Sequence, residues 1–179
     1  MNKTSGNQAE FALMATEGTS VRIGYGLTQV EGDKYEWYEV DLPKKQYPIV
    51  DFETVRNAIL ADINARTDAK ILSGFVWNDK PVWLSGENQF NFKAAYDVAV
   101  QTEGASLPVK FKLGETQEGE PVYHTFTSLN AFTDFYTKAI AYINQCLQDG
   151  WTEKDGIDWT PYQALFPEAT QEGTQQAAE

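Results

Sequence analysis

The sequence predicts an α+β protein made of successive units, each a β-hairpin followed by a helix, with antiparallel sheets packed on the helices. Paired segments that alternate apolar and polar residues are separated by short turns with Gly, Asn or Asp, as in hairpins. Each pair precedes a stretch with apolar residues three and four positions apart, typical of an amphipathic helix. This order occurs three times without strong residue identity, so we interpret it as architectural repetition.

The first hairpin–helix unit lies within residues 19–69. Residues 19–30 alternate as in a half-buried strand, a turn follows, and residues 34–42 return as the second strand. Asp51 can cap a helix over residues 52–66. The apolar residues on one face of that helix are Phe52, Val55, Ile59 and Ile63.

The second unit opens with the clearest hairpin of the chain. Residues 70–77 and 81–84 are predicted strands, and a helix begins at Glu87 or Asn88. Phe75 and Trp77 alternate with Val76, so both faces of this hairpin carry apolar side chains. We therefore expect helices on one face and a further cover, from a second sheet or another subunit, on the other.

The third unit has predicted strands at 107–113 and 122–126. Ser128 can cap the longest helix of the chain, which we expect to end at Gly150. The apolar repeat of this helix predicts that Phe135 and Ile140 belong to the core, whereas Asn144 and Gln145 are predicted to face solvent.

The remaining segments are the two ends. Residues 1–18 are mostly polar and are predicted to form an N-terminal arm, and residues 19–69 a hairpin–helix attachment region. Residues 70–158 form the main α+β domain of the prediction. Residues 159–179 drift into a Gln-, Ala- and Glu-rich tail.

Composition excludes several classes of partner. The chain has 14 basic and 26 acidic residues, a formal net charge of −12, so nucleic acid and anionic membranes are poor partners. The N-terminus lacks the apolar run of a signal peptide, and no segment approaches the roughly 20 apolar residues of a membrane span. We therefore expect synthesis in a cytoplasm. The single cysteine, Cys146, allows no intrachain disulfide.

No catalytic, metal or cofactor residues can be assigned from the sequence. His124, the only histidine, is expected to be an ordinary strand residue with a local partner. Cys146 is expected to be a small buried apolar residue. A pair of carboxylates could serve a small hydrolase, but none of the 26 acids is marked as special.

Tryptophan is the most suggestive residue type, with five in the chain. Its large amphipathic ring suits protein interfaces and also stacking on sugars. The interface candidates are Phe75, Trp77, Trp83, Trp151 and Trp159. A carbohydrate-binding module is the alternative, and it requires at least two exposed tryptophans with coplanar rings in one groove.

The run ILSGFVWNDKPVWLSGENQFNFKAAYDVA at residues 71–99 resembles an uncharacterised domain family of phage and prophage genomes, found near tail and fibre genes. The pattern continues with LPVKFKLG at 107–114, HTFTS at 124–128, FTDFYTKAIAYI at 132–143 and GWTEKDGID at 150–158. The resemblance covers about residues 70–158 and implies no catalytic residues.

The resemblance implies a non-enzymatic structural component of the virion, in the tail, fibre or head-fibre apparatus. Such a protein would act through contacts with other virion proteins. The apolar residues on both hairpin faces separately predict self-association into a homo-oligomer or docking onto another virion protein, with residues 71–84 and the terminal arms at the contacts. It would be synthesised in the bacterial host cytoplasm and reside in the virion after lysis. An assembly factor absent from the mature particle is the alternative within the same family.

Overall fold

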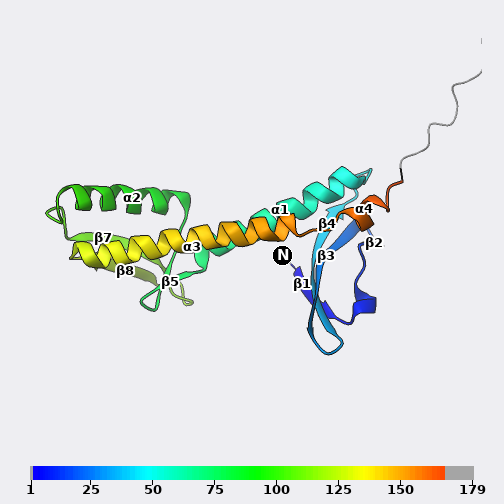
Figure 1. Cartoon of the computed structure of the whole chain (residues 1–179), viewed down its shortest axis with the longest axis horizontal. Helices are drawn as coiled ribbons and strands as arrows, with labels where there is room; N and C mark the ends of the chain where they lie inside the picture. Colours follow the sequence, from blue (N-terminus) through cyan, green and yellow to red (C-terminus); the bar gives the residue numbers. More distant parts are fainter. Residues whose placement is uncertain (1, 168–179) are drawn as a thin grey trace, which may run out of the picture. The chain divides into compact units, whose positions relative to one another are not determined.

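The computed structural model describes residues 2–167, and most of its helices and strands are labelled in Figure 1. It is a mixed α+β structure in which antiparallel strands pack on helices, so the predicted fold class is confirmed. The three expected hairpin–helix units are present, with hairpins within residues 20–43, 75–82 and 109–126 that precede the helices Phe52–Ser73, Gly86–Gln101 and Leu129–Asp155. The described residues divide into an N-terminal lobe, residues 2–62 with 156–167, and a central lobe, residues 63–155. The boundary falls inside α1 (Phe52–Ser73), whereas the predicted domain boundary follows residue 69.

The N-terminal lobe contains a four-stranded antiparallel sheet with strand order β1-β4-β3-β2. Its centre is the predicted first hairpin, in which Ile23 is paired with Val40 and Tyr25 with Tyr38. The strands are β1 (Asn2–Gly6), β2 (Met14–Glu17), β3 (Ser20–Glu31) and β4 (Lys34–Pro43).

The prediction of an N-terminal arm over residues 1–18 is wrong for the residues described. β1 pairs with β4 and β2 with β3, so this segment supplies both edge strands of the sheet. The linking residues cross one sheet face, where the ring of Phe11 packs edge-on against Trp37 at 5.9 Å between centroids. These strands are short and polar, which hides their period of two, and only pairing with the central hairpin makes them strands.

The opposite sheet face forms the core of this lobe. Ile23, Tyr25 and Leu42 are buried there, together with Val55 and Ile59 of α1. The Tyr25 hydroxyl donates to Asp62 Oδ2 at 2.5 Å. The apolar face of β3 therefore packs against the apolar face of α1, as predicted.

Part of the predicted C-terminal tail belongs to the same lobe. α4 (Thr160–Gln163) carries Tyr162, which is 4% exposed and whose hydroxyl donates to the Gly24 carbonyl at 2.8 Å. The rest of the predicted tail, residues 168–179, lies outside the described residues.

Tyr162 makes the N-terminal lobe sensitive to alkaline pH. Burial raises the pKa of Tyr162 to about 12, above the roughly 10 of an unfolded tyrosine. The folded lobe thus holds the phenolic proton more tightly, and this contribution to stability is complete below about pH 10 and lost between about pH 10 and 12.

The Tyr162→Phe variant should lose about 1 kcal/mol at neutral pH, through the missing hydrogen bond, and should show a shallower alkaline decline. Denaturant unfolding at stepwise pH, followed by tryptophan fluorescence, measures both, and Trp159, whose ring lies 6.0 Å from that of Tyr162, contributes to this signal. Tyr142→Phe is the control, since burial also raises the pKa of Tyr142 to about 12 but in the central lobe. An unchanged alkaline slope in Tyr162→Phe would contradict the assignment.

The central lobe packs two hairpins against helices around one aromatic core. Phe92 of α2 and Phe132 and Phe135 of α3 meet Leu113 and Phe126 from the strands, and all five are at most 2% exposed. The elements are β5 (Phe75–Trp77), β6 (Lys80–Val82), α2 (Gly86–Gln101), β7 (Val109–Glu115), β8 (Pro121–Phe126) and α3 (Leu129–Asp155).

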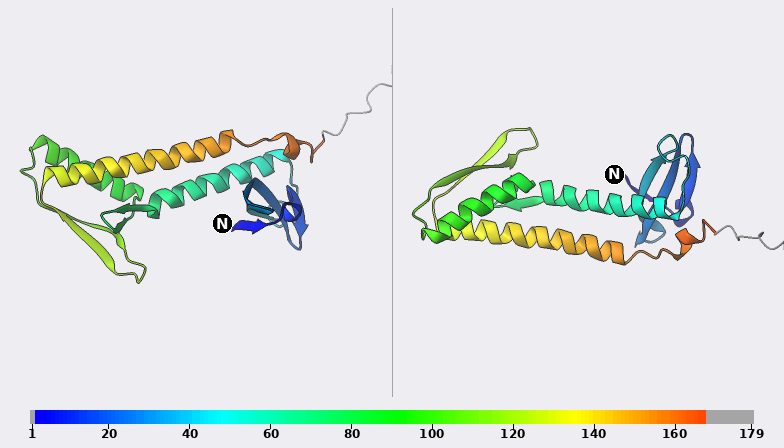
Figure 2. Two further views of the ribbon diagram at one scale, coloured as in Figure 1. Left: turned by 60° about the horizontal axis from the view of Figure 1, so that its bottom comes forward. Right: turned by 90° about the horizontal axis from the view of Figure 1, so that it is seen from above.

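Helix α1 is longer than predicted, because residues 67–73 continue it, and the predicted strand from residue 70 is wrong before Phe75. The reason is a set of contacts with a helix that is distant in the sequence. In the central lobe α1 runs antiparallel to α3 (Figure 2): Arg66 pairs with Glu153 and the Lys70 carbonyl accepts from the Tyr142 hydroxyl at 3.0 Å. Helix α3 thus supplies an ion-pair partner and a hydrogen-bond donor to α1 in the stretch where the apolar repeat of α1 is interrupted in the sequence.

Gly150 does not end α3, which continues to Asp155. It is buried, and a Cβ there would lie 2.5 Å from Thr67 Oγ1, so the missing side chain allows α3 to approach α1 closely. Phe135 is fully buried as predicted, but Ile140 is 38% exposed, so its assignment to the core is wrong. The buried stripe runs through Ala139 instead, and Asn144 and Gln145 are exposed as predicted.

Candidate interaction surface

Two of the predicted interface residues lie inside the central core. Phe75 is 6% and Trp77 4% exposed, because both point to the helix side of the β5–β6 hairpin. The Trp77 ring packs edge-on against Phe135 at 5.3 Å, and its indole N–H donates to Asp134 Oδ2 at 2.9 Å. Neither ring is therefore presented to a partner on the surface of this lobe.

The other side of the two hairpins is open. Val76 is 60%, Trp83 36% and Tyr123 52% exposed. Lys110 and Lys112 of β7, which are two residues apart in the strand, are also exposed. We call these five residues the outer hairpin face.

The outer hairpin face is continuous across both hairpins. The Trp83 backbone N–H donates to the Leu113 carbonyl at 2.7 Å, which joins the chain just after β6 to β7. A Cβ on Gly114 would lie 2.8 Å from the Pro81 carbonyl oxygen, so a glycine is what lets the two hairpins approach this closely. Within each hairpin the strand register aligns the residues of this face, because Val76 pairs with Pro81 and Lys112 with Tyr123.

Each aromatic ring of this face has a lysine beside it. Lys110 Nζ lies 4.6 Å from the centroid of the Tyr123 ring, and Lys112 Nζ lies 5.6 Å from that of Trp83. Lys112 also pairs with Glu115 at 2.6 Å. The surface is thus apolar and aromatic with cationic groups over the rings, in a chain whose net charge is −12.

Trp151 and Trp159 lie elsewhere. Trp151 is 55% exposed near the end of α3, beside the contact of Gly150 with Thr67. Trp159 belongs to the N-terminal lobe, where it is half-buried against the Phe52 ring at 6.2 Å. Within the described residues no ring contact joins two tryptophans. The five predicted candidates are therefore not brought together into one site.

His124 lies on the inner side of β8 and has the local partner that the sequence predicts. Lys80 Nζ is 3.0 Å from His124 Nδ1, and the imidazole packs edge-on against Trp77 at 4.9 Å. Burial first, and the Lys80 charge second, lower the pKa of His124. The imidazole is therefore neutral at pH 7 and accepts a hydrogen bond from the ammonium group. Cys146 is buried on α3, as expected of a small apolar residue.

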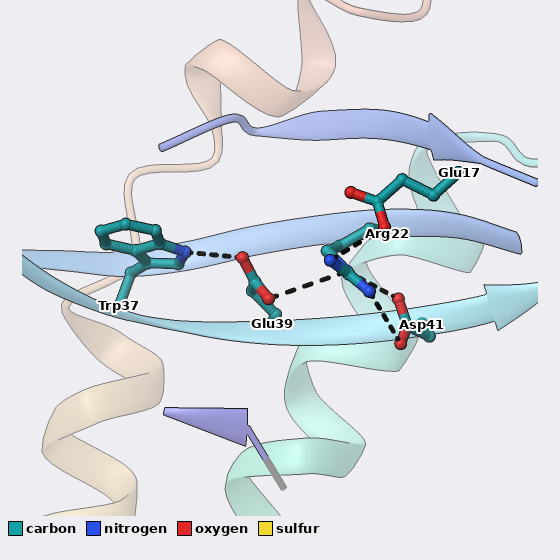
Figure 3. Close-up of polar contacts among 5 residues, drawn as sticks. All are labelled: Glu17, Arg22, Trp37, Glu39 and Asp41. Atoms are coloured by element: carbon teal, nitrogen blue, oxygen red, sulfur yellow. Dashed lines mark hydrogen bonds and ion pairs between the residues drawn. The ribbon is translucent and has the colours of Figure 1, made fainter. Parts of the chain in front are cut away.

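The polar face of the N-terminal sheet carries an ion-pair cluster (Figure 3). Arg22 on β3 lies between Glu17 of β2, at 2.9 Å, and Asp41 of β4, at 2.9 Å, with Glu39 at 3.7 Å. Glu39 also accepts from the Trp37 indole N–H at 2.9 Å. Hydrogen bonding to Asp41 is the main cause that raises the pKa of Arg22.

The cluster links three neighbouring strands through one guanidinium group. It is exposed to solvent, so its electrostatic attraction is screened by salt and its effect on stability is small. Among the residues that the structure describes, no three His, Cys, Asp or Glu side chains converge to hold a metal ion. The carboxylates around Arg22 are thus placed as partners of the guanidinium.

The architecture defines a class of mixed α+β proteins in which antiparallel hairpins pack on helices and leave one hairpin face open. The family model described as a domain of unknown function, DUF4376, matches residues 54–172, more than half of the chain. The chain belongs to the DUF4376 family. Neither a curated protein nor a solved structure matches it.

The family match includes the whole central lobe and therefore the entire outer hairpin face. It also contains the stretch 70–158 over which the sequence resembles a family of uncharacterised domains. The expected resemblance is thus confirmed as far as membership in a family of unknown function, and the association with phages stays a prediction. Across the described part of the chain, the helices are too short or too polar to cross a membrane.

Proposed function

We propose that the chain is a non-enzymatic interaction protein that docks onto other proteins through the outer hairpin face. The observation that supports this is the two-sidedness of the hairpins. One side supplies Trp77 and Phe126 to the core, and the other presents Val76, Trp83 and Tyr123 to solvent. Adjacent apolar and aromatic side chains match the aromatic enrichment of protein interfaces.

The proposed setting is the virion, as a component of the tail, fibre or head-fibre apparatus. The motif resemblance over residues 71–99 supports this, and that run contains Val76 and Trp83 of the proposed face. The partners are other virion proteins and further copies of this chain. An assembly factor that leaves before the particle matures would use the same face.

The carbohydrate-binding alternative retains two exposed tryptophans, Trp83 and Trp151, but no ring contact among the described residues joins them. Lys112 lies near the Trp83 ring, and Lys110 lies over Tyr123, where a sugar would need to stack. Protein docking is favoured because lysine stems and apolar side chains such as Val76 contribute to it directly.

Particle composition and lysine cross-linking test the proposal together. Mass spectrometry of purified particles should find the protein, and an amine-reactive cross-linker should join Lys110 or Lys112 to another polypeptide. Lys93 is the internal control, because it is exposed on α2, away from the hairpins. Consistent absence from particles would remove the structural-component proposal in favour of the assembly factor. Cross-links at Lys93 but not at Lys110 or Lys112 would contradict the docking face.

Mutation of the face should weaken self-association. Val76→Ser with Trp83→Ser removes two apolar groups from the outer hairpin face, and we expect the dissociation constant to rise by about tenfold or more, since buried tryptophans dominate many interfaces. Light scattering over a concentration series measures this. Val98→Ser is the matched control, because Val98 is 48% exposed on α2. An equal effect of both variants would rule out a specific role for the face.

A further inference from the structure

A second surface of the central lobe is a groove of about 530 Å³, separate from the outer hairpin face. Its walls come from α1 and α3, which run antiparallel here, and one end is formed by the residues that lead from β6 into α2. All its lining residues belong to the central lobe.

The groove walls are apolar and follow helical spacing. Ile71 and Leu72 of α1 face Ile143 and Leu147 of α3, two positions that are four residues apart. Leu84, 2% exposed, lines the groove from the segment between β6 and α2, whereas Leu72 is 47% exposed. The wall residues thus offer an apolar stripe that the lobe does not fill with its own side chains.

The groove carries one charge. Asp68 of α1 is the sole charged residue in its lining, and among the described residues no hydrogen bond or ion pair engages its carboxylate. Gln89 donates its amide N–H to the Leu84 carbonyl at 2.6 Å, which leaves the side-chain carbonyl of Gln89 as a further acceptor. The polar groups at the groove therefore favour an occupant that donates hydrogen bonds and carries a positive charge.

We propose that this groove binds an amphipathic helix of a partner protein, with apolar side chains seated between α1 and α3 and a lysine or arginine paired with Asp68. A helix fits because the apolar residues of both walls recur at intervals of three and four residues. Such walls accept apolar side chains of a partner helix that recur at the same intervals. Charge complementarity selects a basic segment, since the groove has one carboxylate and the chain a net charge of −12.

A designed peptide serves as the probe. It is a helix of about 14 residues with a leucine stripe and one flanking lysine, and a matched peptide has glutamate in place of that lysine. Fluorescence anisotropy with the full chain should show binding of the lysine peptide, and weaker binding of the glutamate peptide by about fivefold or more.

Matched variants locate the contact. Leu72→Ser should weaken binding about tenfold, whereas Val98→Ser, with almost the same exposure (47% and 48%), should leave it unchanged. Asp68→Asn should lower the preference for the lysine peptide by about threefold to fivefold, and Asp33→Asn should not. Equal binding of both peptides, equal effects of the paired variants, or no binding at millimolar peptide would each overturn the proposal.

Discussion

Replacing Phe135 by alanine is expected to lower the free energy of unfolding of the central lobe by about 3–5 kcal/mol. Phe135 has no exposed surface, and its ring centroid lies 5.0 Å from that of Phe126, 5.1 Å from Phe92 and 5.3 Å from Trp77. These neighbours come from β8, α2 and β5, so no single element can move in to fill the cavity. The loss therefore includes both the buried ring surface and the contacts of the cavity walls.

Urea unfolding, with amide hydrogen exchange followed in α2 and α3, measures this lobe by itself. The matched control is Ile140→Ala on the same helix, which should cost less than about 1 kcal/mol because Ile140 is 38% exposed. Similar losses in the two variants would show that the buried stripe of α3 is wrongly assigned.

Replacing Gly24 by alanine is expected to cost the N-terminal lobe about 1–3 kcal/mol through overpacking. A Cβ at this position would lie 2.4 Å from the Ala12 carbonyl oxygen and 2.9 Å from the Phe11 ring. The Gly24 carbonyl on the same strand is held by the Tyr162 hydroxyl at 2.8 Å. The strand therefore has little freedom to retreat from the crossing segment, whose backbone would have to move instead.

Denaturant unfolding followed by tryptophan fluorescence measures the effect, and Trp37, whose ring contacts Phe11 of the crossing segment, contributes to this signal. Gly86→Ala is the control, since a Cβ there meets no atom within 4 Å. A wild-type midpoint for Gly24→Ala would mean that residues 7–13 do not cross this face as described.

Local sequence patterns determined most of the secondary structure. Alternation along residues 19–42 predicts the first hairpin because a half-buried strand needs one apolar side chain in every two, and this holds whatever covers it. The repeat of three and four residues around Phe135 predicts the core face of α3 for the same reason. The pattern of Phe75, Val76 and Trp77 also indicates two apolar hairpin faces, of which one remains open.

Other features depend on residues far apart in the sequence, and only the tertiary structure decided them. Residues 2–6 and 14–17 form strands because the edges of β4 and β3 supply hydrogen-bond partners, which their own composition does not reveal. The local sequence predicts that Gly150 ends the helix. Instead Gly150 lies within α3, where its missing side chain allows Thr67 of α1 to approach closely. Ile140 keeps the apolar repeat yet faces solvent, because the neighbours of α3 cover the stripe through Ala139.

The candidate surfaces divide in the same way. The sequence alone singled out Trp83 by residue type, but Lys110, Lys112 and Tyr123 joined it only when the backbone of Trp83, just after β6, hydrogen-bonded to Leu113 of β7. Burial of Phe75 and Trp77 likewise follows from which face α3 covers. A period of two determines that alternate side chains lie on opposite faces, and packing between elements determines which of those faces is core and which is left for a partner.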